Sequence, residues 1–308
     1  MSSKTVRVGT RSSPLARWQA EWVRDSLQAL GHTVELVFIT TQGDVKTGPL
    51  GQIGGQGLFT KEIQRALLAG EVDVAVHSLK DLPTAPIAGL VIGAVPLRES
   101  TGDAFVSNQF ATLAELPAGA RVGTGSLRRR TQLLHARADL TVLDIRGNVD
   151  TRLRKLDDHE FDAIVLAEAG LTRLGLTARI REVIPNHQML PAVGQGALGI
   201  EVREDDAVSR EIVAALNHRE SECAVIAERT MLAELRGGCL APVGAWARVQ
   251  QEQLQLDAVV LSAHGEQRIH AQGTNALDQA ADLGRYVAEQ LRQQGADALI
   301  ATSRSVQS

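Results

Sequence analysis

The chain has 308 residues, of which 44% are hydrophobic and 22% charged, and its formal net charge is −4. This composition is typical of a soluble globular protein with two or three domains, and the acidic balance argues against a general nucleic-acid binder. Residues 1–7 lack the apolar core of a signal peptide, and no apolar run approaches the roughly 20 residues of a membrane helix. The 2 cysteines do not suggest a disulfide framework, so we expect a cytoplasmic protein.

The basic residues are strongly biased towards arginine, with 27 arginines and 5 lysines among the 32. Arginine binds carboxylates and phosphates through a flat, two-pronged face that lysine lacks. A biased genome would produce the same ratio, so the positions of the arginines must decide whether they form an anion site.

The first predicted unit begins with a strand over residues 4–9 and a helix over 14–30. Ser13 as N-cap with Pro14 at the first helical position is a strong helix start. Arg11 and Ser13 then lie at the carboxyl end of the strand, where open α/β sheets bind ligands and helix N-termini favour anions. A plain cap and a solvated surface charge are the alternative interpretations.

A second strand over residues 34–40 leads into a glycine-rich stretch between Gly43 and Gly57, and a helix is expected over 58–69. The stretch lacks the Gly-Lys-Ser/Thr ending of a phosphate loop, which favours a lid or substrate loop.

The almost wholly apolar residues 72–78 predict a buried strand, and Lys80 and Asp81 follow directly at its end. A solvated ion pair in a turn is the alternative for these two, and we interpret His77 as a hydrogen-bonded core histidine. A strand over 90–97 and a polar stretch over 98–102 then mark a domain boundary.

The pattern restarts with a strand over residues 121–125 that contains Thr124. An N-cap at Ser126 follows, and then a helix that opens with Leu127 and three arginines, Arg128, Arg129 and Arg130. Arginines in the first turn oppose the helix dipole at about 0.3–1 kcal/mol each, so they require an anionic partner. A solvent-facing basic cluster is the alternative.

Arginines also follow the next two predicted strands. Arg146, Gly147 and Arg152 come after the strand over 140–145, and Arg173 comes after the strand over 161–166. Their recurrence in both halves predicts two facing α/β domains with an arginine-lined cleft.

The last part begins with a return crossing over 189–197 that contains Gln195. A strand (198–202), two helices (206–216 and 219–236), three strands (243–249, 254–261 and 267–272) and a helix (277–294) are expected to follow, with a frayed tail after Thr302.

The two cysteines differ in their surroundings. Cys223 falls in register with Ile226, Thr230 and Met231, which predicts a buried helical stripe. Cys239 follows Gly237 and Gly238, which end a helix and remove bulk beside the sulfur. A helix cap followed by an unreactive thiol is the alternative for Cys239.

Seven stretches together resemble the porphobilinogen deaminase family, in the same order and over nearly the whole chain. They are residues 10–16 (TRSSPLA), 57–62 (GLFTKE), 75–83 (AVHSLKDLP), 122–129 (VGTGSLRR), 146–149 (RGNV), 190–197 (LPAVGQGA) and 237–239 (GGC).

The resemblance implies an α/β fold with two periplasmic-binding-protein-like domains, each a doubly wound mixed sheet, plus a smaller C-terminal α/β domain. The implied domains are 1–98 with 197–217, 99–196, and 218–308. It also implies a monomer that condenses four porphobilinogen molecules head to tail, releases four ammonia and hydrolyses the product to hydroxymethylbilane. Neither nucleic acid, membrane nor metal is expected as a partner.

The resemblance places a dipyrromethane cofactor on Cys239 through a thioether bond, and makes Asp81 the catalytic carboxylate. The implied cofactor-binding residues are Lys80, Asp81, Thr124, Ser126, Arg128, Arg129, Arg146 and Gly147. The implied substrate-binding residues are Arg11, Ser13, Phe59, Arg152, Arg173 and Gln195. Packing in the core is the alternative for Phe59.

This chain departs from the family pattern at four positions. Gln52 and Gln56 stand in the lid where lysines are common, which predicts weaker cofactor or substrate binding. Gly125 stands where serine is frequent, and Glu168 adds a negative charge near the expected anion cleft. The alternative function is a non-enzymatic, two-lobed carboxylate- or anion-binding protein.

Overall fold

The computed structural model describes residues 5–41, 60–238 and 241–305. Its contacts group the chain into two compact units. The first unit is Met1–Arg98 with Ala197–Glu222, and the second is Glu99–Gly196 with Cys223–Ser308. The division into three domains at the expected boundaries stays a prediction.

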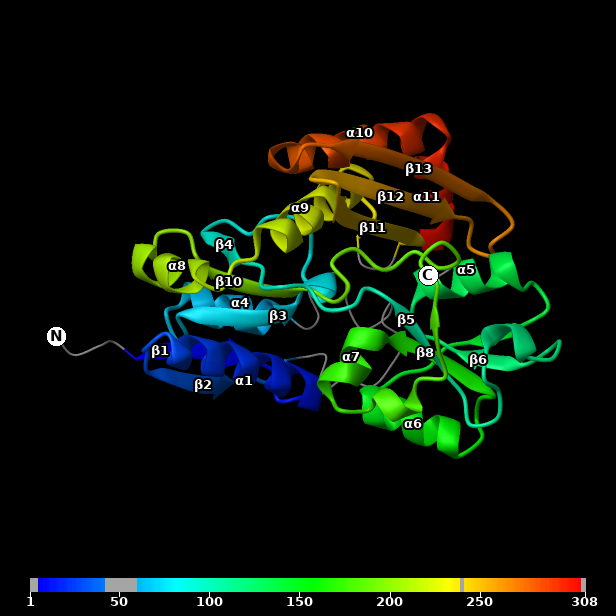
Figure 1. Cartoon of the computed structure of the whole chain (residues 1–308), viewed down its shortest axis with the longest axis horizontal. Helices are drawn as coiled ribbons and strands as arrows, with labels where there is room; N and C mark the ends of the chain where they lie inside the picture. The colour runs from blue at the N-terminus through cyan, green and yellow to red at the C-terminus, as the bar shows by residue number, and fades with distance from the viewer. Residues whose placement is uncertain (1–4, 42–59, 239–240, 306–308) are drawn as a thin grey trace. The chain divides into compact units, whose positions relative to one another are not determined.

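The first unit contains a five-stranded mixed sheet in the order β2-β1-β3-β10-β4 (Figure 1). The strands are β1 (Val6–Thr10), β2 (Val34–Phe38), β3 (Val74–Ser78), β4 (Leu90–Ala94) and β10 (Leu198–Arg203). β1 pairs in parallel with β2 and β3, whereas β10 is antiparallel to both β3 and β4. The chain therefore comes back to this sheet after residue 196 and adds β10 between β3 and β4.

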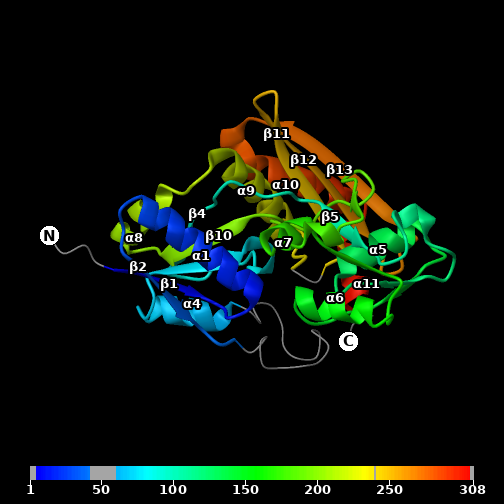
Figure 2. The same ribbon diagram turned by 60° about the horizontal axis from the view of Figure 1, so that its bottom comes forward.

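Helices cover both faces of this sheet (Figure 2). They are α1 (Pro14–Ala29), α4 (Lys61–Leu68) and α8 (Ala207–Ala214), with a short 3-10 turn η1 (Leu79–Asp81) after β3. Val23 of α1 and Val213 of α8 belong to the core on one face, and Leu67 of α4 belongs to the core on the other. Apolar residues on both sides of each strand explain why residues 72–78 form an almost continuous apolar run.

The second unit contains a sheet with the same arrangement, in the order β7-β6-β8-β5-β9. The strands are β5 (Asp103–Val106), β6 (Arg121–Gly123), β7 (Thr141–Leu143), β8 (Ala163–Ala167) and β9 (Glu182–Ile184). β6 pairs in parallel with β7 and β8, and β5 is antiparallel to β8 and β9. The sequence interpretation found β6, β7 and β8 but missed β5 and β9, which have four and three residues.

Helices cover both faces of this second sheet as well. They are α5 (Leu127–Ala136), α6 (Val149–Asp157) and α7 (Glu168–Arg173), with short 3-10 turns η2 (Leu113–Glu115) and η3 (Thr177–Arg179). Leu133 of α5 packs on one face, while Leu156 of α6 and Leu171 of α7 pack on the other.

The C-terminal part of the second unit is an antiparallel sheet in the order β11-β12-β13, packed against helices. Its elements are α9 (Arg219–Glu234), β11 (Val243–Gln250), β12 (Gln253–Leu261), β13 (Arg268–Asn275), η4 (Leu277–Gln279), α10 (Ala280–Gln293) and α11 (Ala296–Ser305). The predicted fold class is therefore confirmed: two doubly wound mixed sheets and a smaller C-terminal α/β domain.

One local prediction about this part is wrong, and another is tested only in part. α11 continues to Ser305 and is anchored by Ala296 and Ile300 in the core, so the helix extends past Thr302; residues 306–308 lie outside the described residues, and fraying there stays a prediction. The stripe on α9 is rotated from the predicted one: Cys223 and Met231 are buried, but Ile226 is 38% exposed. The buried face instead runs through Ala227 and the side chain of Glu228, which hydrogen bonds hold in place.

Candidate active site

The two large sheets present equivalent strand-to-helix turns, from β1 to α1 and from β6 to α5. In the first, the Ser13 hydroxyl oxygen accepts the Ala16 N–H at 3.4 Å. In the second, the Ser126 hydroxyl oxygen accepts the Arg129 N–H at 3.5 Å. Both N-cap predictions are confirmed, and these caps place the neighbouring arginines at the carboxyl ends of β1 and β6.

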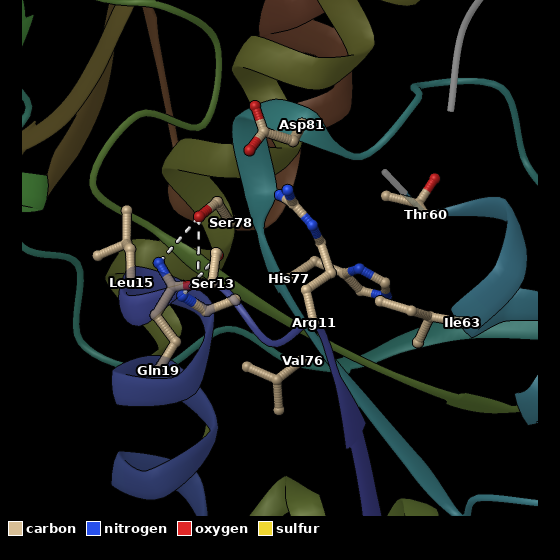
Figure 3. A pocket seen from close by; sticks show the side chains of 11 residues that line it. Arg11, Ser13, Leu15, Gln19, Thr60, Ile63, Val76, His77, Ser78 and Asp81 are labelled. Atoms are coloured by element: carbon tan, nitrogen blue, oxygen red, sulfur yellow. Dashed lines mark hydrogen bonds between the residues drawn. The ribbon is translucent and has the colours of Figure 1, made fainter. Parts of the chain in front are cut away.

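A pocket lies at the carboxyl end of β1 and β3 in the first unit (Figure 3). Arg11, Ser13 and Asp81 line it, so the structure brings these three predicted site residues together. In Figure 3 the Arg11 side chain points towards Asp81. Asp81 is exposed, and its neighbour Lys80 is half-buried in the same turn, η1.

Buried polar side chains support the floor of this pocket. The Gln19 amide nitrogen donates to the Ser78 hydroxyl oxygen at 2.8 Å. His77, 4% exposed, lies 3.1 Å through Nε2 from Glu201 Oε2, and Gln64 donates to the other oxygen of Glu201 at 3.0 Å. His77 is thus the hydrogen-bonded core histidine that the sequence predicts, and it also lines the pocket.

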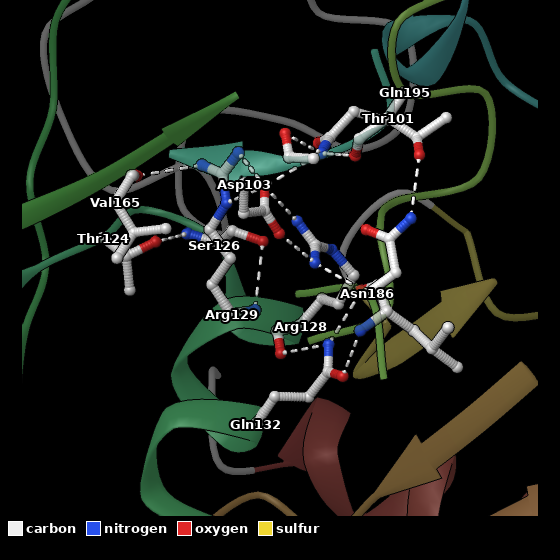
Figure 4. A network of polar contacts seen from close by, with 12 residues as sticks. Thr101, Asp103, Thr124, Ser126, Arg128, Arg129, Gln132, Val165, Asn186 and Gln195 are labelled. Carbon is white, nitrogen blue, oxygen red and sulfur yellow. Dashed lines mark hydrogen bonds and ion pairs between the residues drawn. The ribbon is translucent and has the colours of Figure 1, made fainter. Parts of the chain in front are cut away.

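The second unit holds a buried arginine cluster around Asp103, which opens β5 (Figure 4). Arg128 donates through Nη1 to Asp103 Oδ2 at 2.7 Å and through Nη2 to Oδ1 at 3.2 Å. Arg129 donates through Nε to Oδ1 at 2.9 Å. Asp103, Arg128 and Arg129 are 0%, 3% and 6% exposed, so the alternative of a solvent-facing basic cluster is wrong for this pair.

The anion that arginines in a first helical turn require is therefore supplied, in part, by the chain itself. Burial alone would raise the pKa of Asp103, but the charges and hydrogen bonds of Arg128 and Arg129 outweigh burial and hold that pKa well below its ordinary value. Burial lowers the pKa of Arg128, and the charge of Asp103 opposes that shift. One carboxylate facing two guanidinium groups leaves the three side chains with a surplus of one positive charge.

Gln195 and Gln132 complete the cluster. The Gln195 amide nitrogen donates to Asp103 Oδ1 at 2.9 Å and to the Thr101 carbonyl at 2.7 Å. Gln132 holds both backbone groups of Leu190, accepting its N–H at 2.8 Å and donating to its carbonyl at 3.0 Å. Thr124 accepts the Ser126 N–H at 3.3 Å. The network in Figure 4 therefore unites five predicted site residues: Thr124, Ser126, Arg128, Arg129 and Gln195.

The remaining predicted arginines have other partners. Arg146 donates to Asp144 at 2.7 Å, and Arg152 donates to the Gly147 carbonyl at 2.8 Å. Gly147 has φ +110, and a Cβ there would lie 2.6 Å from a Thr151 methyl carbon, so this turn requires glycine. Arg173 donates to the Gly196 carbonyl at 2.7 Å.

Burial lowers the pKa of Arg173, and the charge of Glu99 opposes that shift. None of the hydrogen bonds described above joins Arg146, Arg152 or Arg173 to Asp103. Among the described residues, the predicted site thus divides into the pocket, the cluster around Asp103, and these three arginines.

The structure shows the contacts of two residues that depart from the family pattern, Glu168 and Gly125. The Glu168 carboxylate accepts a hydrogen bond from the Ser100 hydroxyl group. At Gly125, a Cβ would lie 2.8 Å from the Ile145 carbonyl oxygen and 3.7 Å from Arg146 Nη1. The backbone of the adjacent loop therefore approaches Gly125 closely.

Some predicted residues lie outside the described part of the chain: Cys239, Phe59, Gln52 and Gln56. Their roles stay predictions. Conversely, the sequence interpretation missed Asp103, Gln19, Gln132 and Glu201. The available signal for Asp103 was an acidic residue opening the short apolar run Ala104–Val106, but nothing local indicated that this run forms a strand beside β8.

Comparisons with known proteins give consistent matches over most of the chain. The family model of the porphobilinogen deaminase dipyrromethane cofactor-binding domain matches residues 6–211, and that of the porphobilinogen deaminase C-terminal domain matches residues 223–293. A porphobilinogen deaminase of Desulforudis audaxviator (strain MP104C) is 51% identical over 305 residues, which cover 98% of this chain and 99% of that protein.

Similar solved structures include a putative methionine-binding lipoprotein from Bacillus subtilis, with 15% identity and a TM-score of 0.45, covering 71% of this chain and 92% of the other. The methionine-binding protein MetQ has 18% identity and a TM-score of 0.45, with coverage of 69% and 89%.

Proposed function

This chain belongs to the porphobilinogen deaminase family, and we propose which of its residues perform that family's reaction. The enzyme is a transferase of tetrapyrrole biosynthesis. It condenses four porphobilinogen molecules head to tail with release of four ammonia, and hydrolyses the product to hydroxymethylbilane. A non-enzymatic anion-binding protein is not favoured, because both family models describe the enzyme.

The surplus positive charge of the cluster around Asp103 is the observation that carries the assignment of the binding residues. A buried charge is costly unless it is paired, and Arg128 Nε is a buried donor without a partner in the described residues. Each pyrrole unit of substrate and cofactor carries an acetate and a propionate group. A carboxylate would neutralise the cluster by charge-assisted hydrogen bonds, so the residues present fit a carboxylated pyrrole.

Dipyrromethane is the cofactor of this family, and when bound it supplies the covalently held pyrrole to which the first substrate is joined. We assign its attachment to Cys239. Cys223 is only 8% exposed and packs in the C-terminal core with Ala224 and Ala227, where a bulky thioether would have no room. The residues that would hold the cofactor are Lys80, Asp81, Thr124, Ser126, Arg128, Arg129, Arg146 and Gly147.

Asp81 is the proposed catalytic carboxylate. It is exposed, it follows a buried strand, and it lines a pocket with Arg11, whose guanidinium group can bind a substrate carboxylate. When ammonia leaves, positive charge develops on the pyrrole of the incoming substrate. Asp81 would stabilise that charge and accept or return a proton.

The other proposed substrate ligands stay as the sequence predicts them. Ser13 lies beside Arg11 in the pocket, and the remaining residues are Phe59, Arg152, Arg173 and Gln195. We also propose a cytoplasmic monomer that needs neither metal nor nucleic acid. Within residues 5–41, 60–238 and 241–305, no helix combines the length and apolarity that a membrane crossing demands.

Intact mass spectrometry tests the attachment site directly. The purified chain should carry covalent mass beyond its sequence and should colour with a pyrrole reagent. Cys239→Ser should lose both properties, whereas the matched variant Cys223→Ala should keep them. Added mass on Cys239→Ser, or its loss from Cys223→Ala, would show that the assignment is wrong.

A further inference from the structure

Asp103 contacts three side chains that the proposed function assigns to ligand binding: Arg128, Arg129 and Gln195. Its Oδ1 lies 2.8 Å from Arg129 Nη2 in addition to the bonds from Arg129 Nε and from Gln195. Its Oδ2 takes Arg128 Nη1. The carboxylate therefore contacts both guanidinium groups along their edges, which restrains their planes (Figure 4).

Backbone carbonyls hold the same two guanidinium groups from other directions. Arg128 Nη1 donates to the Leu190 carbonyl at 2.6 Å, and Arg129 Nη1 donates to the Val165 carbonyl at 3.1 Å. These carbonyls are fixed in turn, because Val165 belongs to β8 and Leu190 is held by Gln132. The arginine pair thus has little freedom to reorient when a ligand arrives.

Asp103 also determines how much charge the pair presents. Without it, two guanidinium groups in one buried site would repel each other and present two positive charges. With it, three side chains that are each at most 7% exposed carry a surplus of one. One further carboxylate makes the group neutral, and a second would make it negative in a site with little water.

We propose that Asp103 is a positioning residue of this enzyme: it fixes the planes of Arg128 and Arg129 and limits the pair to one ligand carboxylate. This inference rests on the proposed role of the two arginines as ligands of the dipyrromethane cofactor. Asp103 acts through the arginines and does not itself touch the cofactor.

Asp73 provides a matched control in the first unit. Its side chain is 2% exposed and also faces two arginines, with Arg7 Nη2 at 2.8 Å and Arg203 Nη2 at 3.7 Å. It precedes β3, at the opposite end of that strand from Asp81. Replacing Asp73 removes a buried carboxylate from an arginine pair that the proposed function does not use.

The experiment combines Asp103→Ala with added formate, a carboxylate small enough for the space the side chain leaves. We expect the loaded fraction, measured by intact mass, and kcat/KM to fall about a hundredfold, because misplaced binding groups cost that much. Formate should restore a large part of both, and sodium chloride at equal ionic strength should not. Asp73→Ala should keep parental loading and turnover without formate.

Three results would overturn the inference. The first is parental loading and turnover of Asp103→Ala. The second is a formate-dependent rise of Tm without recovery of loading, which is what a purely structural role would give. A second variant is used if Asp103→Ala does not fold: Asp103→Glu keeps the charge but moves it by one methylene. The third contradicting result is parental loading of the folded Asp103→Glu variant.

A separate pair of variants tests the premise. Arg128→Gln and Arg129→Gln should each lower the loaded fraction. If both load like the parent, the proposed ligand role of the arginines fails, whatever the Asp103 variants do. If they lose loading while Asp103→Ala does not, only the positioning role fails.

Discussion

The β1–α1 and β6–α5 turns occupy the same place in two sheets of the same strand order, yet they use arginine differently. Arg11 is half-buried and lines an open pocket. Arg128 and Arg129 lie in the first turn of their helix and are buried against Asp103. The equivalent position in the two sheets places the arginines near the carboxyl end of a strand in both cases. Whether those arginines are accessible depends on another strand of the sheet, because β5 carries Asp103.

The carboxylates of Asp81 and Asp103 also differ in their exposure to solvent. Asp81 is exposed, so substrate or water can reach its carboxylate. Asp103 is buried, and its two arginines keep its pKa far below neutral pH, so it stays ionised throughout a turnover near neutral pH. The accessible carboxylate in the pocket is what the proposed proton transfer requires, and the buried cluster is what the proposed binding of a ligand carboxylate requires.

The largest expected effect is on the exposed carboxylate. Asp81→Asn should retain the covalent cofactor but lose turnover by about 10²- to 10⁴-fold, because the proposed general acid-base group is gone. Intact mass and a steady-state assay check the two halves separately. Asp282→Asn, on the exposed surface of α10, is the control and should leave turnover unchanged. Normal turnover of Asp81→Asn would remove the catalytic distinction between the two regions.

The next effect concerns the buried carboxylate. Asp103→Asn should lower the free energy of unfolding by about 3–5 kcal/mol, because one partner of a buried ion pair is lost. Asp162→Asn, which breaks a half-exposed pair with Arg121, should cost much less. Urea unfolding of both variants measures the difference, and equal losses would contradict the contrast between buried and exposed pairs.

The parent and Asp103→Asn should also differ in how their free energy of unfolding depends on pH. The pKa of Asp103 is lowered in the folded state, so its stabilisation is present above the unfolded pKa of about 4 and is lost as the pH falls. The parent should therefore lose stability faster than Asp103→Asn between about pH 5 and pH 2. Urea midpoints measured across this range check it, and parallel curves would contradict it.

A smaller loss of stability is expected from a side chain added to the backbone of the second turn. Gly125 corresponds in the second turn to the exposed Ser12 of the first. Gly125→Ser should destabilise the protein by about 1–3 kcal/mol, because its Cβ would press on the Ile145 carbonyl oxygen. Ser12→Ala should stay within about 0.5 kcal/mol of the parent. A Gly125→Ser chain as stable as the parent in thermal unfolding would show that the adjacent loop yields.

The smallest effect should be shared by the two turns. Ser13→Ala and Ser126→Ala each remove an N-cap hydrogen bond, worth about 0.5–2 kcal/mol. Because both bonds are long, at 3.4 and 3.5 Å, we expect losses near the lower end of that range. Unfolding midpoints of the two variants should shift alike. A much larger shift for one of them would show that its serine does more than cap a helix.

The signals that the sequence carries are local. Ser13-Pro14 and Ser126 are confirmed as helix starts, since a cap depends on residues three positions apart. The apolar run over 72–78 corresponds to the buried β3, and Asp81 at its end reaches the pocket. Short-range patterns were enough to find these features because the residues that create them are neighbours in the chain.

The sequence by itself indicated two α/β domains, the helix starts and the arginines that follow the strands, because caps, periodicity and chain order need no distant partner. The full fold class came from the resemblance to the family. Only the tertiary structure decided that Arg128 and Arg129 are buried on Asp103. That contact depends on β5 pairing with β8, about 60 residues further along the chain, and on Gln195 arriving later still. No local sequence pattern indicates the contact of Asp103 with these side chains, because the contact forms only when the sheet has folded.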